Sequence, residues 1–245
     1  MSIYIMSDIH GDYKKYMQML ELLQFNKEDT LYILGDVIDR GENGMKILQD
    51  MMKHSNIIPI LGNHEYMAVK ALKWLMTEVT EKSIKTINED TLLIFTEWIN
   101  VGGEATINEF YKLSREEKEE ILEYLLNFEV YETVEIGMRS FVLVHAGLEN
   151  FSEKRSMEDY SFLELIFGRT DYESVYFKDK YLVTGHTPTR LIYATEQGIL
   201  LEQMDPFQYQ DEIFMKNNHI AIDCGCGYGG RLGAICLDTM ERYYV

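Results

Sequence analysis

The sequence predicts an α/β fold in which two β-sheets pack face to face as a sandwich flanked by helices, an αββα layering. In the first half of the chain, a short apolar run, a polar glycine-bearing loop and an amphipathic helix follow one another three times. That alternation predicts neighbouring parallel strands with crossover helices. The second half contains shorter, paired strands separated by turns, which predict the second sheet. At 245 residues the chain can bury a substantial core, and we expect one domain over 1–245.

The first unit begins with an apolar strand at 3–6 and continues into Ser7-Asp8-Ile9-His10-Gly11-Asp12. Residues two apart at the end of an extended strand point the same way, so Asp8 and His10 can reach one point. Apolar residues from Tyr13 to Leu23 then recur at helical spacing, with Asp12 placed as the N-cap.

The second and third units repeat this order. A buried strand at 31–34 ends in the loop Gly35-Asp36-Val37-Ile38-Asp39-Arg40-Gly41, and a helix with methionines at core spacing follows. A strand at 57–61 ends in Gly62-Asn63-His64-Glu65, and we expect a helix from about 66 to 76. Because the carboxyl ends of parallel strands share one edge, the three polar loops should lie side by side.

The segment at about 80–128 interrupts this alternation and predicts a mostly helical insertion. It contains Trp98-Ile99-Asn100-Val101-Gly102-Gly103-Glu104-Ala105-Thr106, with a Gly-Gly break. Ser114 and Glu117 have the spacing of a capping box before an apolar helix. We expect the segment to cover the strand ends, to wall one side of a substrate groove, and to set substrate choice more than catalytic power. A purely packing role is the alternative.

The second half predicts strands whose ends again carry histidine. Strands at 131–136 and 141–144 flank the turn Gly137-Met138-Arg139, and the second ends at His145. A strand at 181–184 ends at His186. Paired strands are expected at 191–195 and 199–202, and further strands at 220–223 and 232–237.

Composition limits the partners and the compartment. The formal net charge of -18 repels nucleic acid and anionic membranes, so an anionic substrate must be bound locally through metal ions or a few arginines. The apolar start of the chain has no basic segment before it, and no run approaches the roughly 20 residues of a membrane span. The clustered Cys224, Cys226 and Cys236 favour small strand residues in a reducing cytoplasm over a disulfide framework or a metal site.

Five strand ends thus carry groups that bind metal. They are Asp8 with His10, Asp36 with Asp39, Asn63 with His64, His145, and His186. Imidazole, carboxylate and amide oxygen together suit Mn, Fe, Ni, Co or Zn, and two such ions about 3.5–4 Å apart serve in-line phosphoryl displacement. We expect Asp36 to bridge two ions, with Asp8 and His10 on one and Asn63, His145 and His186 on the other.

The ordered motifs resemble the phosphoprotein phosphatase family of calcineurin-like metallophosphoesterases. They are Asp-Ile-His-Gly at 8–11, Gly-Asp-Val-Ile-Asp-Arg-Gly at 35–41, Gly-Asn-His-Glu at 62–65, His-Ala-Gly at 145–147 and Gly-His-Thr at 185–187. The tail at 222–232 resembles the closing strand motif of the bacterial branch, which includes protein phosphatases and symmetrical dinucleoside tetraphosphate hydrolases. The Cys-Gly-Cys of this tail departs from the family's motif. Phe167, before Gly168-Arg169, also departs from it, because relatives tend to have Trp there.

The resemblance implies two divalent metal ions, Mn above all, and the same ligands. It adds His64 as general acid oriented by Asp39, and Arg40 and Arg169 as phosphate-binding residues, with Asn63 also near the phosphate. It implies hydrolysis by a metal-bridging hydroxide.

The function expected first is a cytoplasmic serine/threonine phosphatase acting on a phosphoprotein or a small phosphorylated substrate. The alternative is a symmetrical dinucleoside tetraphosphate hydrolase of the same fold, in which Tyr228 and Arg231 could contact a second nucleotide. A phosphopeptide-binding module is disfavoured because a binder needs no proton donor at His64. A structural metal cage is disfavoured because such sites are usually closed and rich in sulfur. The sequence leaves the oligomeric state open.

Overall fold

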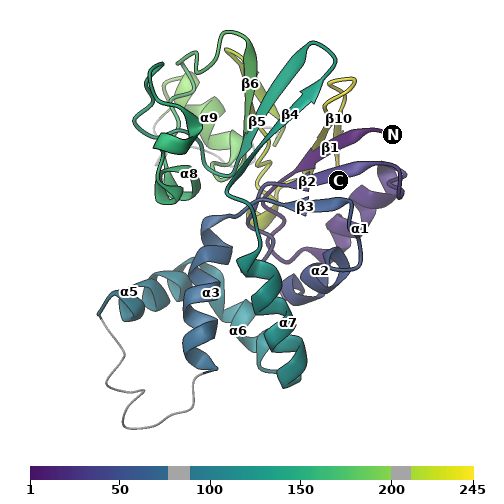
Figure 1. Ribbon diagram of the computed structural model, residues 1–245, viewed down its shortest axis with the longest axis vertical. Coiled ribbons are helices and arrows are strands. Elements are labelled where there is room, and N and C mark those ends of the chain that lie inside the picture. Colours follow the sequence, from purple (N-terminus) through teal and green to yellow (C-terminus); the bar gives the residue numbers. More distant parts are fainter. Residues whose placement is uncertain (77–88, 200–210) are drawn as a thin grey trace.

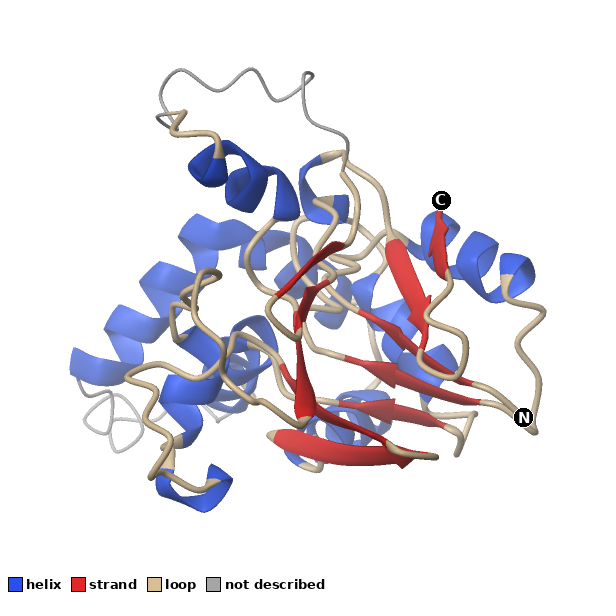
Figure 2. Ribbon diagram, turned by 90° about the horizontal axis from the view of Figure 1, so that it is seen from above, coloured by secondary structure: helices blue, strands red, loops and turns tan. Residues whose placement is uncertain are grey.

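The computed structural model describes residues 1–76, 89–199 and 211–245. Two five-stranded sheets face each other, and helices cover their outer faces (Figures 1 and 2). The predicted αββα sandwich is therefore confirmed. Within the described residues, no helix has the length and apolar character that crossing a membrane would require.

The first sheet has the strand order β10-β9-β1-β2-β3. Its strands are β1 (Ile3–Met6), β2 (Thr30–Ile33), β3 (Ile57–Pro59), β9 (Gly233–Cys236) and β10 (Arg242–Tyr244). Strands β1, β2 and β3 are parallel, as the alternation of the first half predicts. Strands β9 and β10 add an antiparallel edge.

The second sheet has the order β4-β5-β6-β8-β7. Its strands are β4 (Tyr131–Ile136), β5 (Arg139–Val144), β6 (Lys180–Thr184), β7 (Phe214–Lys216) and β8 (His219–Ala221). Strands β5, β6 and β8 are parallel. Each sheet therefore brings the carboxyl ends of three parallel strands to the same rim of the sandwich, where ligands of α/β sheets bind.

Alternation along the strands creates separate cores on the two faces of each sheet. In β1, Ile5 points between the sheets, where it packs with Leu34, Phe141 and Val183. Its neighbour Met6 points the other way, into the core beneath the helices of the first half. Strands buried on both faces need apolar residues at every position, which explains the continuous apolar runs in the sequence.

Helices of the first half pack against the first sheet and below it (Figure 1). They are α1 (Tyr13–Leu22), α2 (Gly44–Met51), α3 (Asn63–Leu75), α5 (Glu89–Trp98), a π-helical turn (Ile99–Gly103), α6 (Glu104–Phe110) and α7 (Arg115–Leu126). Asp12 caps α1 by accepting from the Lys15 N–H at 3.0 Å. Ser114 and Glu117 form the predicted capping box of α7. The described part of segment 80–128 is thus largely helical.

The second sheet carries α8 (Phe162–Phe167) and α9 (Thr189–Glu196). Helix α9 corrects the sequence prediction, which placed a strand at 191–195. The β-branched residues there favour a strand, but Thr189 and Ile192, one helical turn apart, are both buried, and tertiary packing overrides the local propensity. Its predicted partner at 199–202 lies outside the described residues except for Ile199, which is in a loop.

The element boundaries that differ from the prediction include those of α3 and β5. Helix α3 begins at Asn63, not at about residue 66, so Asn63 and His64 lie in its first turn. Arg139 is the first residue of β5 and not part of the preceding turn.

Candidate active site

The six predicted metal ligands all follow parallel strands and meet at one rim. Asp8 and His10 follow β1, Asp36 follows β2, and Asn63 opens α3 after β3. His145 and His186 follow β5 and β6 of the second sheet. The site therefore lies where the ends of both sheets meet, and each sheet contributes part of it.

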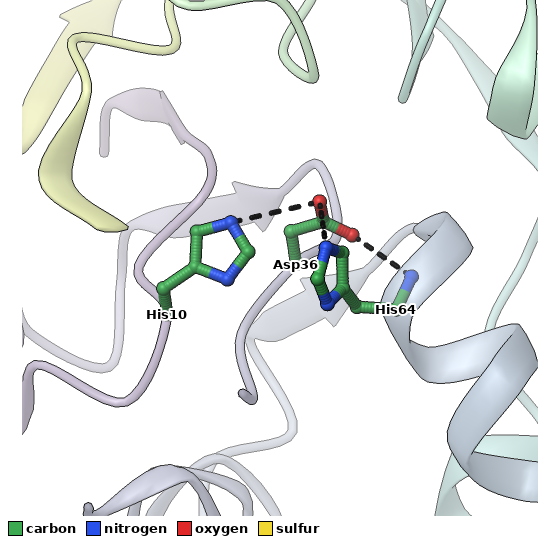
Figure 3. Close-up of side chains that lie close together, drawn as sticks. All are labelled: His10, Asp36 and His64. Atoms are coloured by element: carbon green, nitrogen blue, oxygen red, sulfur yellow. Dashed lines mark hydrogen bonds and ion pairs between the residues drawn. The ribbon is translucent and has the colours of Figure 1, made fainter. Parts of the chain in front are cut away.

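Asp36 occupies the centre of this group. Its Oδ2 lies 3.7 Å from Nε2 of His10 and 3.7 Å from Nε2 of His64 (Figure 3). Its Oδ1 lies 3.4 Å from Nε2 of His145. The Asp36 carboxylate is thereby part of two sets of side chains with the spacing of metal ligands, one with His10 and His64, the other with His145 and His186. This central place is the one that the sequence analysis assigned to a bridging carboxylate.

Hydrogen bonds fix the tautomers of two histidines. Nδ1 of His10 lies 3.0 Å from the Ile38 carbonyl, and Nδ1 of His145 lies 2.6 Å from the Leu34 carbonyl. A carbonyl only accepts, so each Nδ1 carries a proton. Burial lowers the pKa of both imidazoles, which leaves them neutral, with a lone pair on Nε2. Metal-binding histidines are usually oriented in this way.

The lone pair of His145 converges with other acceptors. Its Nε2 lies 2.9 Å from Oδ1 of Asn63 and 3.4 Å from Oδ1 of Asp36. Oδ1 of Asn63 is also 3.0 Å from Nδ1 of His186, whose buried Nε2 has no hydrogen-bond partner among the described residues. Nε2 of His145, Oδ1 of Asn63 and Oδ1 of Asp36 are all hydrogen-bond acceptors, and they repel one another unless a cation lies among them. These ligand atoms therefore fit a divalent metal ion.

The opposite end of the site contains an arginine. Nη1 of Arg40 lies 2.7 Å from Nε2 of His10, and Nη2 lies 3.3 Å from Nε2 of His64. In this structure the guanidinium thus donates to the lone pair with which His10 would bind a metal ion. Asp8 lies beside this group, where its Oδ2 accepts from Ser7 Oγ and from the His186 backbone N–H.

Buried carboxylates concentrate negative charge at the rim. Burial, Asp223 and Asp36 raise the pKa of Asp8 well above its ordinary value. The pKa of Asp36 is lowered instead, because the histidines, with His145 foremost, outweigh the effect of burial. Burial raises the pKa of Asp223 to about 7. Such a cluster of carboxylates is stabilised by bound cations.

Asp223 and Glu65 were given no role by the sequence analysis. Asp223 follows β8 as the other acidic residues follow their strands. The expectation that polar residues directly after parallel strands meet at one edge therefore predicts Asp223 as part of the site. Glu65 is fully buried, and its carboxylate accepts from the backbone N–H groups of Asp36 and Val37, each at 2.8 Å. It thereby holds the loop that carries Asp36, a contact between segments that no local pattern predicts.

His64 and Asp39 form a buried pair. Nδ1 of His64 lies 2.6 Å from Oδ2 of Asp39. Burial alone would lower the pKa of His64, but Asp36 and Asp39 together raise it above its ordinary value. The imidazole is therefore favoured in its protonated form, with Nε2 directed toward Asp36 and Arg40.

A cavity of about 740 Å³ opens over these residues. Arg40 and the exposed Arg169 line it together with His64, and so do the aromatic rings of Phe167 and Tyr228. Residues Glu97, Asn100 and Val101 form part of its wall, so the 80–128 segment does border the groove. Arg190 also lines the cavity, but Asp211 pairs with it through two contacts of 2.7 Å.

The fold and this convergence of imidazoles and carboxylates define a metal-dependent hydrolase site of the metallophosphoesterase class. The family model described as calcineurin-like phosphoesterase matches residues 1–213. The chain belongs to the calcineurin-like phosphoesterase family, whose fold implies a site for two divalent metal ions.

Two curated relatives are named symmetrical bis(5'-nucleosyl)-tetraphosphatases. The protein from Wigglesworthia glossinidia brevipalpis is 36% identical over 107 residues, which cover 40% of this chain and 38% of that relative. The protein from Methylobacillus flagellatus is 25% identical, and the match covers 100% of this chain and 95% of the relative. The chain thus spans well under half of the first relative's length and nearly all of the second's.

Two solved structures share the fold. A crystal structure provisionally named a diadenosine tetraphosphatase matches with a TM-score of 0.63 and 18% identity, covering 99% of this chain and 92% of that one. A protein serine/threonine phosphatase from Saccharomyces cerevisiae with similarity to human phosphatase PP5 matches with a TM-score of 0.56 and 13% identity, covering 96% and 72%. At these identities the likeness concerns the fold alone.

Proposed function

We propose that this protein is a metal-dependent hydrolase that cleaves dinucleoside polyphosphates symmetrically. The observation that carries the proposal is the name shared by the curated relatives, one of which matches along 95% of its length. The sequence motifs predict a serine/threonine phosphatase first and this activity as the alternative. The comparisons support the alternative better.

The cavity supports a substrate with two nucleosides. Phe167 of α8 and Tyr228, from the turn Cys226–Tyr228, line the same cavity as the two arginines, and both rings are exposed. Every nucleobase has a flat face that stacks on an aromatic ring, a contact worth about 1–3 kcal/mol per base. A phosphate chain held between such contacts would lie over Asp36.

We assign Asp8, His10 and Asp36 to one divalent ion, and Asp36, Asn63, His145 and His186 to the second. Mn suits these ligands, as do Fe, Zn, Ni and Co. The ions would neutralise the phosphate charge and lower the pKa of the attacking water.

The remaining side chains have roles of their own. Arg40 and Arg169 bind phosphate oxygens, whose charge matches the guanidinium fork. His64 donates its Nε2 proton to the departing oxygen while Asp39 holds Nδ1. A nucleoside diphosphate is a less basic leaving group than an alkoxide, so this proton matters less for an anhydride than for a phosphoserine ester.

Phosphoserine and phosphothreonine hydrolysis is the second candidate. The buried His64–Asp39 pair favours it, because an alkoxide leaving group needs a proton donor.

A side-by-side turnover assay with Mn²⁺ separates the two candidates. We expect diadenosine tetraphosphate to be converted into two molecules of the diphosphate, identified by chromatography, much faster than phosphoserine peptides are dephosphorylated. Faster turnover of the peptides, or products of unequal phosphate number, would overturn the proposal.

A further inference from the structure

Segment 98–106 surrounds the carboxylate of Asp39 with hydrogen-bond donors. Trp98 Nε1 donates to Oδ2 of Asp39 at 2.7 Å, and Thr106 Oγ1 donates to Oδ1 at 2.5 Å. Oδ2 also accepts from Nδ1 of His64 at 2.6 Å. The side chains of Trp98, Thr106 and Asp39 have no exposed surface. We propose that Trp98 and Thr106 are positioning residues for the reaction, acting through Asp39 on His64. The proposal rests on the proton-donor role of His64 in the proposed function.

The direction of the Thr106 hydroxyl is fixed. Its oxygen accepts from the Asp39 backbone N–H at 3.0 Å, so its own proton is directed to Oδ1 of Asp39. The carboxylate is therefore held at both oxygens, with the remaining acceptor direction of Oδ2 aimed at His64. An ionised carboxylate in a dry site requires such donors. Without one of them the carboxylate can rotate, and the imidazole loses its orientation toward the departing oxygen.

The path of the chain explains the Gly-Gly break noted in the sequence. Between Trp98 and Thr106 the helical backbone is kinked at Gly102, which has a non-helical φ of 112°. A Cβ atom on Gly102 would lie 2.7 Å from Cγ of Arg40, and one on Gly103 would lie 2.6 Å from the Trp98 ring. The kink lets the segment lie directly against the loop at 35–41, at Arg40.

The same segment also holds Arg40. The Arg40 backbone N–H donates to the Gly102 carbonyl at 3.1 Å, and Nε of its guanidinium donates to the Val101 carbonyl at 3.4 Å. Segment 98–106 thus contacts both the proposed acid pair and a proposed phosphate-binding residue. The expectation that the whole segment 80–128 sets substrate choice more than catalytic power stays a prediction. The part at 98–106 in addition supports the chemical step.

The test compares two leaving groups in variants that remove one donor each. Thr106→Val keeps the shape of the side chain and removes the hydroxyl, which both donates to Oδ1 and accepts from the backbone N–H of Asp39. Trp98→Phe removes the indole N–H and leaves a smaller aromatic ring. Thr106→Ser keeps the hydroxyl. We expect Thr106→Val and Trp98→Phe to lower kcat on a phosphoserine peptide or alkyl phosphate by about 10- to 100-fold, with KM little changed. The loss on nitrophenyl phosphate should be clearly smaller, and Thr106→Ser should recover most of the activity. Thr96→Val is the matched control, because Thr96 is exposed in α5, just before this segment, and among the described residues its hydroxyl bonds its own helix through the Leu92 carbonyl.

Two further measurements decide the interpretation. Metal content by elemental analysis should stay at the wild-type level, because neither residue contacts a proposed ligand. In a His64→Ala background, Thr106→Val should cause no further leaving-group-dependent loss, since the two act in one chain. Equal losses on both substrates, no rescue by serine, or an undiminished effect without His64 would overturn the proposal. If His64→Ala itself shows no leaving-group dependence, the proposed proton donor is wrong, whatever Thr106 does.

Discussion

Replacement of His219 by Phe is predicted to make the protein less sensitive to acid. His219 lies in β8 with 1% of its surface exposed, stacked on Tyr172 at 5.0 Å. Its Nε2 is 2.9 Å from Oγ1 of Thr184, and its Nδ1 has no hydrogen-bond partner among the described residues. Burial lowers its pKa from 6.5 to about 3. The folded state therefore keeps this ring neutral over a range in which the unfolded chain takes up a proton.

The sign and size of the effect follow from this difference. Between pH 6.5 and 3 the unfolded state binds more protons, so the free energy of unfolding falls as the pH falls. At pH 5 the unfolded state gains RT ln(1 + 10^1.5), about 2 kcal/mol, whereas at pH 7.5 the gain is close to zero. For a chain of this size that corresponds to a decrease in Tm of about 4–8 °C.

Urea unfolding of chelator-treated protein at pH 7.5 and pH 5 measures the effect. His219→Phe keeps the ring stack but loses the bond to Thr184, so at pH 7.5 we expect it to be about 1–2 kcal/mol less stable than wild type. On going to pH 5 it should lose about 2 kcal/mol less than wild type does. Equal losses in His219→Phe and wild type would refute the reasoning.

Three other substitutions test the site. Asp36→Asn removes the central negative charge and should weaken both metal sites and nearly abolish turnover. If elemental analysis finds two ions still bound and the variant is fully active, Asp36 does not bridge the two ions. His64→Ala should reduce turnover of phosphoserine peptides by about 10²–10⁴-fold and that of nitrophenyl phosphate distinctly less, and equal losses or loss of metal would assign His64 another role. Phe167→Ala should raise KM for diadenosine tetraphosphate by about 5- to 100-fold, because one stacking contact is lost. KM for nitrophenyl phosphate should stay unchanged. An unchanged KM for the dinucleotide would show that Phe167 does not contact a nucleoside.

The sandwich and the location of the site could be predicted because they follow from local rules. Parallel strands place their carboxyl ends at one edge, and each predicted ligand directly follows an apolar run. The sequence alone therefore indicated that Asp8, Asp36 and Asn63 would meet, and the structure brings them together with His145 and His186 from the second sheet. The same rule applies to Asp223, which also follows an apolar run.

The features that could not be predicted depend on contacts between distant segments. Helix α9 mixes helix formers with β-branched residues and Tyr193, which favour a strand, and its packing against the second sheet decides its conformation. The bond from Trp98 to Asp39 joins residues 59 positions apart, and the bond from Thr106 joins residues 67 apart. Residue type and spacing describe neither contact, so the role of segment 98–106 required three-dimensional structure.

The backbone of the site shows why these distant contacts matter. Six of the eleven non-glycine residues with positive φ in the described chain belong to the site loops: Asp8, His10, Asp36, Asp39, Arg40 and His186. Glycine would adopt this conformation without strain but would bring no side chain, whereas other residues held there cost about 1–3 kcal/mol each in sparsely populated regions.

Such strain persists only where surrounding structure fixes the loop. The Glu65 carboxylate binds the backbone N–H of Asp36, and the Gly102 carbonyl binds that of Arg40. Helix α3 and segment 98–106 therefore enforce the conformation of a loop to which they do not belong. The motif at 35–41 supplies Asp36, Asp39 and Arg40, but its geometry depends on residues elsewhere in the chain, so the motif alone, transferred to another scaffold, would not reproduce the site.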